Sequence, residues 1–341
     1  MKTSKPDLLQ FLYLRTTKLL IAENSLIVSD VCKVKIFDSF EAMKFSKNLR
    51  SNMVARLGGQ NNFYQTQASE LSDQTIIEIY KVATPDEILK VGENLAFWAE
   101  KLAILSTTFT LPRKDLLRRL GISTSITSEV NFAVTNSFKT IRSSSQNAPK
   151  TNGIKLNKQV CNRFSRCGFK ELFQYLQGED DLCKRINVST DRLFESRCEP
   201  KLTAAVVKTA IALESLLIFS ESESLARALS ERMAFILSNL PETRQKISRV
   251  ISKFYEVRSG IVHGGKKKVK SLSPALVECV DRLAILIYLL VANNKHIWPS
   301  IDSLRLWCED QKWSSPATNI NMPFPQIYLK NALALVNAEM K

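Results

Sequence analysis

The chain has 341 residues, of which 45% are hydrophobic and 24% are charged, and it contains only 10 Gly and 11 Pro. This composition excludes disordered, collagen-like and low-complexity proteins, and the length is enough for two domains. Lys and Arg number 48 against 33 Asp and Glu, which gives a net charge of +15. Such an excess favours polyanionic partners such as nucleic acid, although a solubilising surface would also explain it.

Three further features bear on location and chemistry. The longest uninterrupted apolar run, residues 283–292, has 10 residues, whereas a bilayer span needs about 18. Residues 1–7 lack the apolar stretch of a secretory signal. The seven cysteines include no CxxC pair, and there are only two histidines, His263 and His296. We therefore expect a cytoplasmic protein with reduced thiols, no membrane contact, no metal and no cofactor.

The first part of the chain contains short runs typical of strands. Residues 31–37 alternate with a period of two, residues 75–80 are rich in β-branched side chains, and residues 58–62 have the composition of a turn. A helix is predicted from Thr84 as N-cap, with Pro85 and Glu87 completing the start signal. We therefore predict a mixed α+β domain over residues 1–142, with a sensor or regulatory role left open.

A polar, turn-rich stretch follows this domain and predicts a linker over residues 143–165. Between Val130 and Lys170 there is no Asp or Glu, while eight positive residues occur: Lys139, Arg142, Lys150, Lys155, Lys158, Arg163, Arg166 and Lys170. This block either follows a phosphate backbone or is a solvated loop.

The rest of the chain has helical periodicity. Helices are predicted over residues 202–219, 225–240 and 242–257, and a fourth begins at Ser273 and Pro274. Short connections between them predict an antiparallel α-helical bundle over residues 166–300, with residues 301–341 as a tail whose Trp307 and Trp313 pack on it. The predicted fold class is therefore α+β, a mixed N-terminal domain followed by a helical bundle.

The end of the third bundle helix carries the candidate site. Arg258, Ser259 and His263 lie there, just before Gly264 and Gly265, and the run continues into Lys266, Lys267, Lys268 and Lys270. Each part also has a structural explanation: glycines stop helices, lysines complement the helix dipole, and a lone histidine near a helix end is more often structural than catalytic.

Taken together, three segments in order give a more specific indication: residues 212–217, residues 229–234 and the string from Tyr255 to Gly264, which fits the motif R-x(4–6)-H. On these segments, residues 169–297 resemble a HEPN domain, in particular the Apea-like branch. The resemblance implies a metal-independent endoribonuclease that acts as a homodimer or higher homo-oligomer. It further implies a toxin-like role in prokaryotic anti-phage or stress defence, with a protein trigger or inhibitor. The alternative is a non-catalytic HEPN module that binds RNA or mediates protein assembly.

The residue types suit this chemistry. RNA carries its own nucleophile, the 2′-hydroxyl, so a neutral His263 need only take that proton or donate one to the leaving 5′-oxygen. Arg258 is permanently charged and can stabilise the phosphorane-like transition state. Lys266, Lys267, Lys268 and Lys270 either guide RNA to the cleft or form a solvated loop.

Two residues leave alternatives open. Ser259 stands where active family members often have Asn, Asp or His, although a serine can still donate a hydrogen bond to phosphate. Glu214, in a predicted buried helix, either orients Arg258 or His263 or pairs with a bundle arginine such as Arg227 or Arg232.

Helix geometry separates the two motif residues. Five steps of about 100° place Arg258 and His263 roughly 140° apart on an ideal helix. Either the helix is distorted near Gly260, or His263 lies just beyond its end, or a second chain completes the site; we favour a composite cleft in a dimer. A DNA-associated regulator ranks last, because no helix-turn-helix signature occurs.

Overall fold

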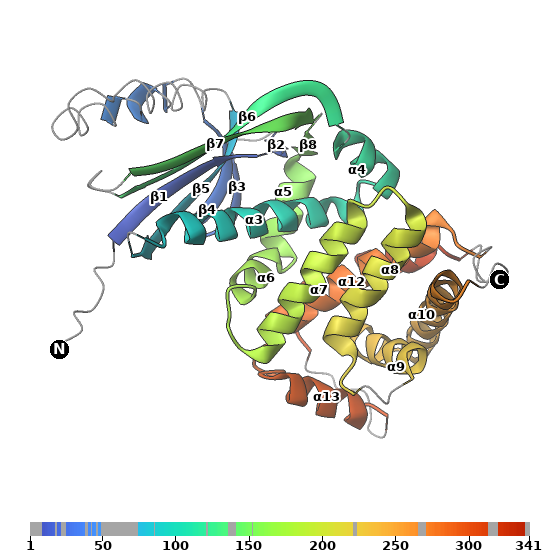
Figure 1. Cartoon of the computed structure of the whole chain (residues 1–341). Coiled ribbons are helices and arrows are strands. Elements are labelled where there is room, and N and C mark those ends of the chain that lie inside the picture. The colour runs from blue at the N-terminus through green and yellow to red at the C-terminus, as the bar shows by residue number, and fades with distance from the viewer. Residues whose placement is uncertain are drawn as a thin grey trace. The chain divides into compact units, whose positions relative to one another are not determined.

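The computed structural model describes residues 9–17, 19–21, 25–37, 40–41, 43–45, 47–48, 74–84, 86–120, 122–135, 141–151, 153–220, 224–264, 271–312 and 320–337. These residues form an α+β protein (Figure 1). The chain divides into two compact units, of which unit 1 is residues 1–104 and 118–162, and unit 2 is residues 105–117 and 163–341. Within the described ranges, no helix is long and apolar enough to cross a membrane.

Unit 1 is built on an antiparallel sheet with the strand order β3-β4-β5-β1-β6-β7. Its strands are β1 (Leu9–Thr16), β3 (Ser25–Ser29), β4 (Cys32–Phe37), β5 (Gln74–Ala83), β6 (Ile122–Thr135) and β7 (Ile141–Thr151). A parallel pair of short strands, β2 (Leu19–Ile21) and β8 (Ile154–Leu156), completes the unit. The predicted strands at 31–37 and 75–80 are confirmed as β4 and β5.

One face of the sheet forms the core of unit 1 against α3 (Ile88–Ser106). Gly92 of this helix packs against the ring of Tyr13. A Cβ at this position would come within 2.4 Å of the ring, so only glycine fits there. The predicted start of this helix is only partly right: Thr84 Oγ1 donates to Glu87 Oε2 over 2.6 Å, but the helix itself begins at Ile88. Pro85 and the predicted turn at 58–62 lie outside the described residues.

The predicted linker is wrong for the residues that the structure describes. In place of a loop, this stretch contains β7, β8 and helix α5 (Lys158–Arg166). Polar residues suit β7 because it pairs with β6 alone among the described strands. Its backbone groups therefore form hydrogen bonds with one neighbouring strand. An edge strand of this kind does not need the apolar side chains by which a central strand is recognised from sequence.

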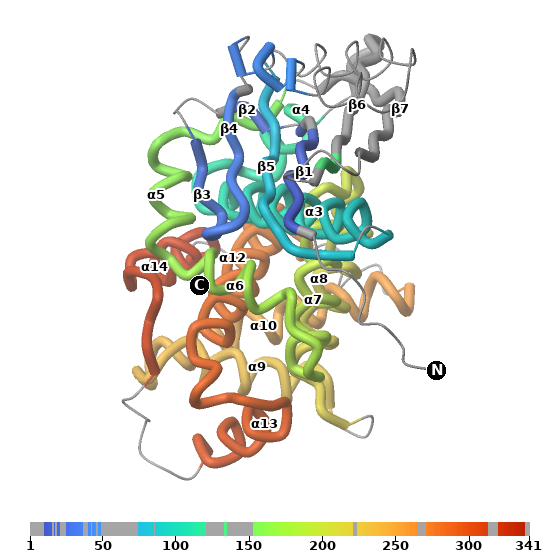
Figure 2. The backbone as a smooth tube through the Cα atoms, turned by 90° about the vertical axis from the view of Figure 1, so that its left-hand side faces the viewer, coloured from blue at the N-terminus to red at the C-terminus, as the bar shows by residue number. Residues whose placement is uncertain are grey.

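Unit 2 is helical around one central element. Helix α12 (Pro274–Asn293) is buried at every residue from 276 to 292 except Arg282. The other helices are α6 (Phe169–Tyr175), α7 (Asp181–Arg197), α8 (Leu202–Leu217), α9 (Leu225–Leu237), α10 (Pro241–Val262), α13 (Ile301–Asp310) and α14 (Ile327–Ala334). The backbone view in Figure 2 follows the same helices from another side. The predicted start of α12 is confirmed, since the Ser273 side chain accepts a hydrogen bond from the Leu276 amide.

Residues 105–117, which we name the strap, belong to unit 2 although the chain on both sides of them belongs to unit 1. The strap contains the short helix η1 (Thr107–Phe109) and the start of α4 (Arg113–Leu120). The two units therefore do not divide at residue 142, where the first predicted domain ends. Local periodicity could not show this, because the strap joins unit 2 through side chains distant in sequence.

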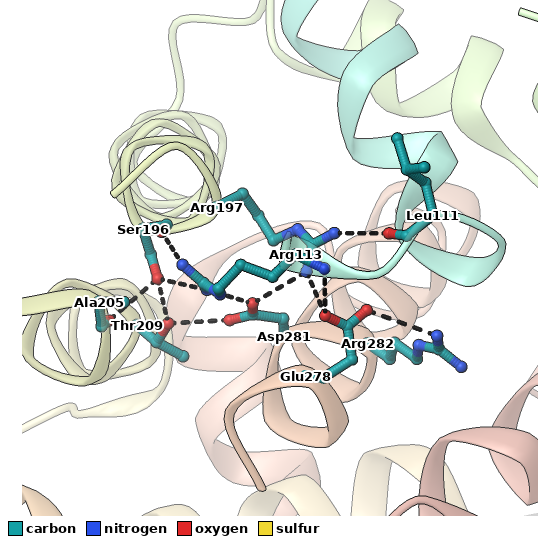
Figure 3. Close-up of polar contacts among 9 residues, drawn as sticks. All are labelled: Leu111, Arg113, Ser196, Arg197, Ala205, Thr209, Glu278, Asp281 and Arg282. Carbon is teal, nitrogen blue, oxygen red and sulfur yellow. Dashed lines mark hydrogen bonds and ion pairs between the residues drawn. The ribbon is translucent and has the colours of Figure 1, made fainter. Parts of the chain in front are cut away.

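Buried charges hold the strap in unit 2 (Figure 3). Arg113 Nη2 lies 2.6 Å from Asp281 Oδ2, and Arg197 Nη1 lies 2.6 Å from Glu278 Oε2. Arg197 also donates to the carbonyl of Leu111 over 3.1 Å. We name these four charged residues (Arg113, Arg197, Glu278 and Asp281) the buried ion network, since the relative exposure of each is 7% or less.

Arg163 also holds the strap, near the start of this segment. Arg163 is 4% exposed, donates to the carbonyl of Ser106 over 2.8 Å and to Tyr328 Oη over 3.2 Å, and lies beside the Phe109 ring. The tail therefore packs within unit 2 through α14. Trp307 of α13 also packs there, edge-on against the buried Trp298 with ring centroids 5.1 Å apart. Trp313 lies outside the described residues.

We expect Arg113→Ala to lower the free energy of unfolding by about 3–5 kcal/mol, because it leaves the Asp281 carboxylate buried without its main partner. Denaturant unfolding of the full chain, followed by tryptophan fluorescence, measures this loss. The matched control is Arg192→Ala, which breaks the exposed pair with Glu195 and should cost less than about 1 kcal/mol. Equal effects of the two substitutions would contradict the prediction.

A pH-dependent contribution is expected from Glu78 in unit 1. Burial alone would raise the pKa of Glu78, but hydrogen bonds and charges from Lys35 and Lys33, whose Nζ atoms lie 2.7 and 2.9 Å away, lower it below its ordinary value. A lowered pKa in the folded state stabilises the protein above the unfolded pKa, and this stability is lost as the pH falls through the folded pKa.

We therefore expect the stability difference between the wild type and Glu78→Gln to shrink as the pH is lowered below about 4. Denaturant unfolding at several pH values measures it. A difference that stays constant with pH would show that Glu78 makes no such contribution.

Candidate functional site

The candidate site lies where α8 and α10 pack together in unit 2. Glu214 projects from the last turn of α8, and Arg258 from the last turns of α10. Arg258 Nη2 lies 3.3 Å from Glu214 Oε1, and both side chains are partly accessible, with 22% and 21% of their surface exposed. Of the partners expected for Glu214, the structure therefore gives Arg258.

The alternative arginine partners make other contacts. Arg227 Nε lies 2.9 Å from Glu231 Oε1 on the surface of α9. Arg232 donates to the carbonyl of Leu217 over 2.6 Å and lies over the Phe219 ring.

A third residue joins this pair from within the unit. Tyr255 is 4% exposed, and its hydroxyl lies 3.2 Å from Glu214 Oε1 and 3.3 Å from the carbonyl of Ala210. Burial raises the pKa of Tyr255 far above its ordinary value, and the neighbouring carboxylate of Glu214 raises it further. The hydroxyl therefore stays protonated and can donate to the carboxylate.

Tyr255 is the first residue of the sequence motif that ends at Gly264, but the motif alone assigns it no role. The available signal was its spacing, because residues three apart share one face of a helix.

His263 lies just beyond the end of α10. The helix runs without interruption through Gly260 to Val262, and His263 is its C-cap, whose amide donates to the carbonyl of Ser259 over 2.9 Å. The sequence left three geometries open: a helix distorted near Gly260, a His263 just beyond the helix end, or a site completed by a second chain. The described residues show His263 just beyond the helix end. The His263 side chain is exposed, and Ser259 is half-buried.

One chain does not join the two motif side chains. Arg258 is on the face of α10 that meets α8, whereas His263 lies beyond the end of α10 and is exposed. Among the described residues, no hydrogen bond or ion pair links them. The predicted RNA-guiding lysines, Lys266, Lys267, Lys268 and Lys270, lie outside the described residues.

The arrangement offers two chemical capacities. The guanidinium of Arg258 pairs with Glu214 through one terminal nitrogen, and its side chain is 22% exposed, so the group can also bind an anion. The imidazole of His263 is exposed, so a substrate can reach it. Within the described ranges, no group of three or more His, Cys, Asp or Glu side chains is placed to hold a metal ion.

The position of His263 depends on the glycine that follows it. Gly264 has φ = +72°, a left-handed conformation that residues other than glycine rarely adopt. Apart from its chain neighbours, no described residue has an atom within 4 Å of the place where its Cβ would be. Since there is no steric clash, we expect Gly264→Ala to cost about 1 kcal/mol through backbone strain alone. Urea unfolding measures the cost. The control, Glu256→Ala on the exposed face of α10, should change stability by less than about 0.5 kcal/mol.

Comparison of the chain with protein-family models, with curated proteins and with solved structures finds no match. The function of the protein is therefore inferred from the chemistry of its own residues.

Proposed function

We propose that the protein is an endoribonuclease that cleaves RNA without a metal ion, by attack of a 2′-hydroxyl on the adjacent phosphodiester. The observation that carries the proposal is the pairing of Arg258 with Glu214, five residues before an exposed histidine that caps the same helix. Unit 2 then corresponds to a HEPN-like bundle. The net charge of +15 supports a polyanionic substrate.

Each residue has a definite role in this reaction. His263 takes the proton of the 2′-hydroxyl as a neutral base, or donates one to the departing 5′-oxygen as an acid. Arg258 binds the phosphate and offsets the charge of the phosphorane-like transition state, and Ser259 donates a hydrogen bond to it. Glu214 orients Arg258. The products are a 2′,3′-cyclic phosphate and a 5′-hydroxyl, so DNA, which lacks the nucleophile, is not cleaved.

The active species is a homodimer or higher homo-oligomer in this proposal. Within one chain, no hydrogen bond or ion pair among the described residues links Arg258 and His263, and a second chain would place an imidazole beside the guanidinium. Two chains also supply two imidazoles, one for each proton transfer. The exposed apolar side chains of Ile211 (39%) and Val262 (49%), which lie close in sequence to Glu214 and His263, support an interface there.

The biological setting follows from the same proposal. A ribonuclease of this kind acts as a toxin in prokaryotic anti-phage or stress defence, in the cytoplasm. Unit 1 would restrain it or sense a protein trigger, and the lysines after Gly265 would guide RNA to the cleft.

The test is incubation of the purified full chain with end-labelled RNA in EDTA. We expect cleavage that falls by about 10²–10⁴-fold in His263→Ala and by about 10²–10³-fold in Arg258→Ala, as for loss of an acid–base group and of a charge-stabilising donor. The matched controls are His296→Ala, the other histidine of the chain, and Arg249→Ala, an exposed arginine of the same helix; both should cleave like the wild type.

Two outcomes would contradict the proposal. RNA binding without cutting would favour the alternative, a non-catalytic HEPN module that binds RNA or mediates protein assembly. Cleavage that persists when the nucleotide at the cut site is replaced by its 2′-deoxy form would exclude 2′-hydroxyl attack.

A further inference from the structure

We infer that Tyr255 is a positioning residue, which fixes the carboxylate of Glu214 so that Glu214 holds the Arg258 guanidinium in one orientation. Its catalytic consequence rests on the proposed ribonuclease function, whereas the positioning itself does not.

The ion pair alone is too weak to fix Arg258. It consists of one N···O contact of 3.3 Å between side chains that are 22% and 21% exposed. Pairs of this kind contribute little, because water screens the charges and two long side chains must lose their rotamer freedom. The Nε of Arg258 adds no hydrogen bond within the described residues. Among the described residues, Glu214 is thus the one ion-pair partner of the guanidinium, and it needs a further constraint to hold Arg258 in place.

Tyr255 supplies the missing constraint from the interior. Its hydroxyl and Arg258 Nη2 converge on the same atom, Glu214 Oε1, at 3.2 and 3.3 Å. The carboxylate oxygen accepts a hydrogen bond from Tyr255 and forms an ion pair with Arg258. The tyrosine ring is held by packing, including an edge-on contact with the Phe254 ring at 5.8 Å. A rigid, buried donor therefore selects one rotamer of Glu214, and that rotamer selects the orientation of Arg258.

The spacing of these residues along α8 and α10 brings them together. Tyr255 and Arg258 are three residues apart on α10 and face the same side, and Ala210 and Glu214 are four residues apart on α8. The hydroxyl lies within 3.3 Å of both the Ala210 carbonyl and Glu214. Removing this single oxygen would leave the ring in place and remove its contacts with the Glu214 carboxylate and the Ala210 carbonyl.

The test compares Tyr255→Phe with Tyr288→Phe. Tyr288 is a fully suitable control, because it is 1% exposed, lies in the same unit, and its hydroxyl contacts Ser189 far in sequence from Arg258. We expect Tyr255→Phe to lower kcat for RNA cleavage by about tenfold with little change in KM, since misplacing a charge-stabilising group affects the transition state most. Tyr288→Phe should lower stability without this loss.

A second measurement keeps the inference separate from the proposed function. The exchange rate of the Arg258 Nε proton with water, followed by ¹⁵N NMR and assigned with Arg258→Lys, should rise by about fivefold or more in Tyr255→Phe and stay unchanged in Tyr288→Phe. An unchanged rate in Tyr255→Phe would overturn the inference. A raised rate in a protein that does not cleave RNA would instead uphold the positioning and reject the ribonuclease.

Discussion

The buried ion network is the constraint on which unit 2 depends. Two carboxylates, Glu278 and Asp281, lie on the central helix α12 and are compensated by Arg197 of α7 and Arg113 of the strap. Charges removed from water are costly unless each is paired and hydrogen-bonded, so the helices that carry them have little freedom to move independently. Apolar packing brings these helices together, and the network links α12, α7 and the strap through specific charged partners.

The same network extends toward the candidate site. Asp281 Oδ1 accepts a hydrogen bond from Thr209 on α8 over 2.9 Å, and Thr209 contacts Ser196 on α7. Ala210, whose carbonyl lies beside the Tyr255 hydroxyl, is the next residue along α8, and Glu214 follows one turn later. The helix that carries the carboxylate is therefore fixed on one side by buried charges and on the other by a buried tyrosine.

Local patterns in the sequence were enough for β4, β5, α8, α9, α10 and α12, because apolar periodicity and caps such as Ser273 are local. They were not enough for the strap, since Arg113 and Asp281 are 168 residues apart and Arg113 looks like an ordinary surface residue at the start of a helix. They also failed at β7, where an edge strand needs backbone partners more than apolar side chains. For the site, the sequence offered a position of His263 just beyond the helix end as one of three geometries, whereas the choice of Glu214 partner required the packing of α8 on α10.

The strap has a consequence for any attempt to divide the chain. A fragment that begins after residue 162, where the second segment of unit 1 ends, would keep Asp281, Glu278 and Arg197 but lose Arg113 and the Leu111 carbonyl. A fragment that ends there would carry residues 105–117 as an unprotected segment without the surfaces that bury them. Neither fragment would therefore contain the contacts between the strap and the rest of unit 2, although each unit has its own core.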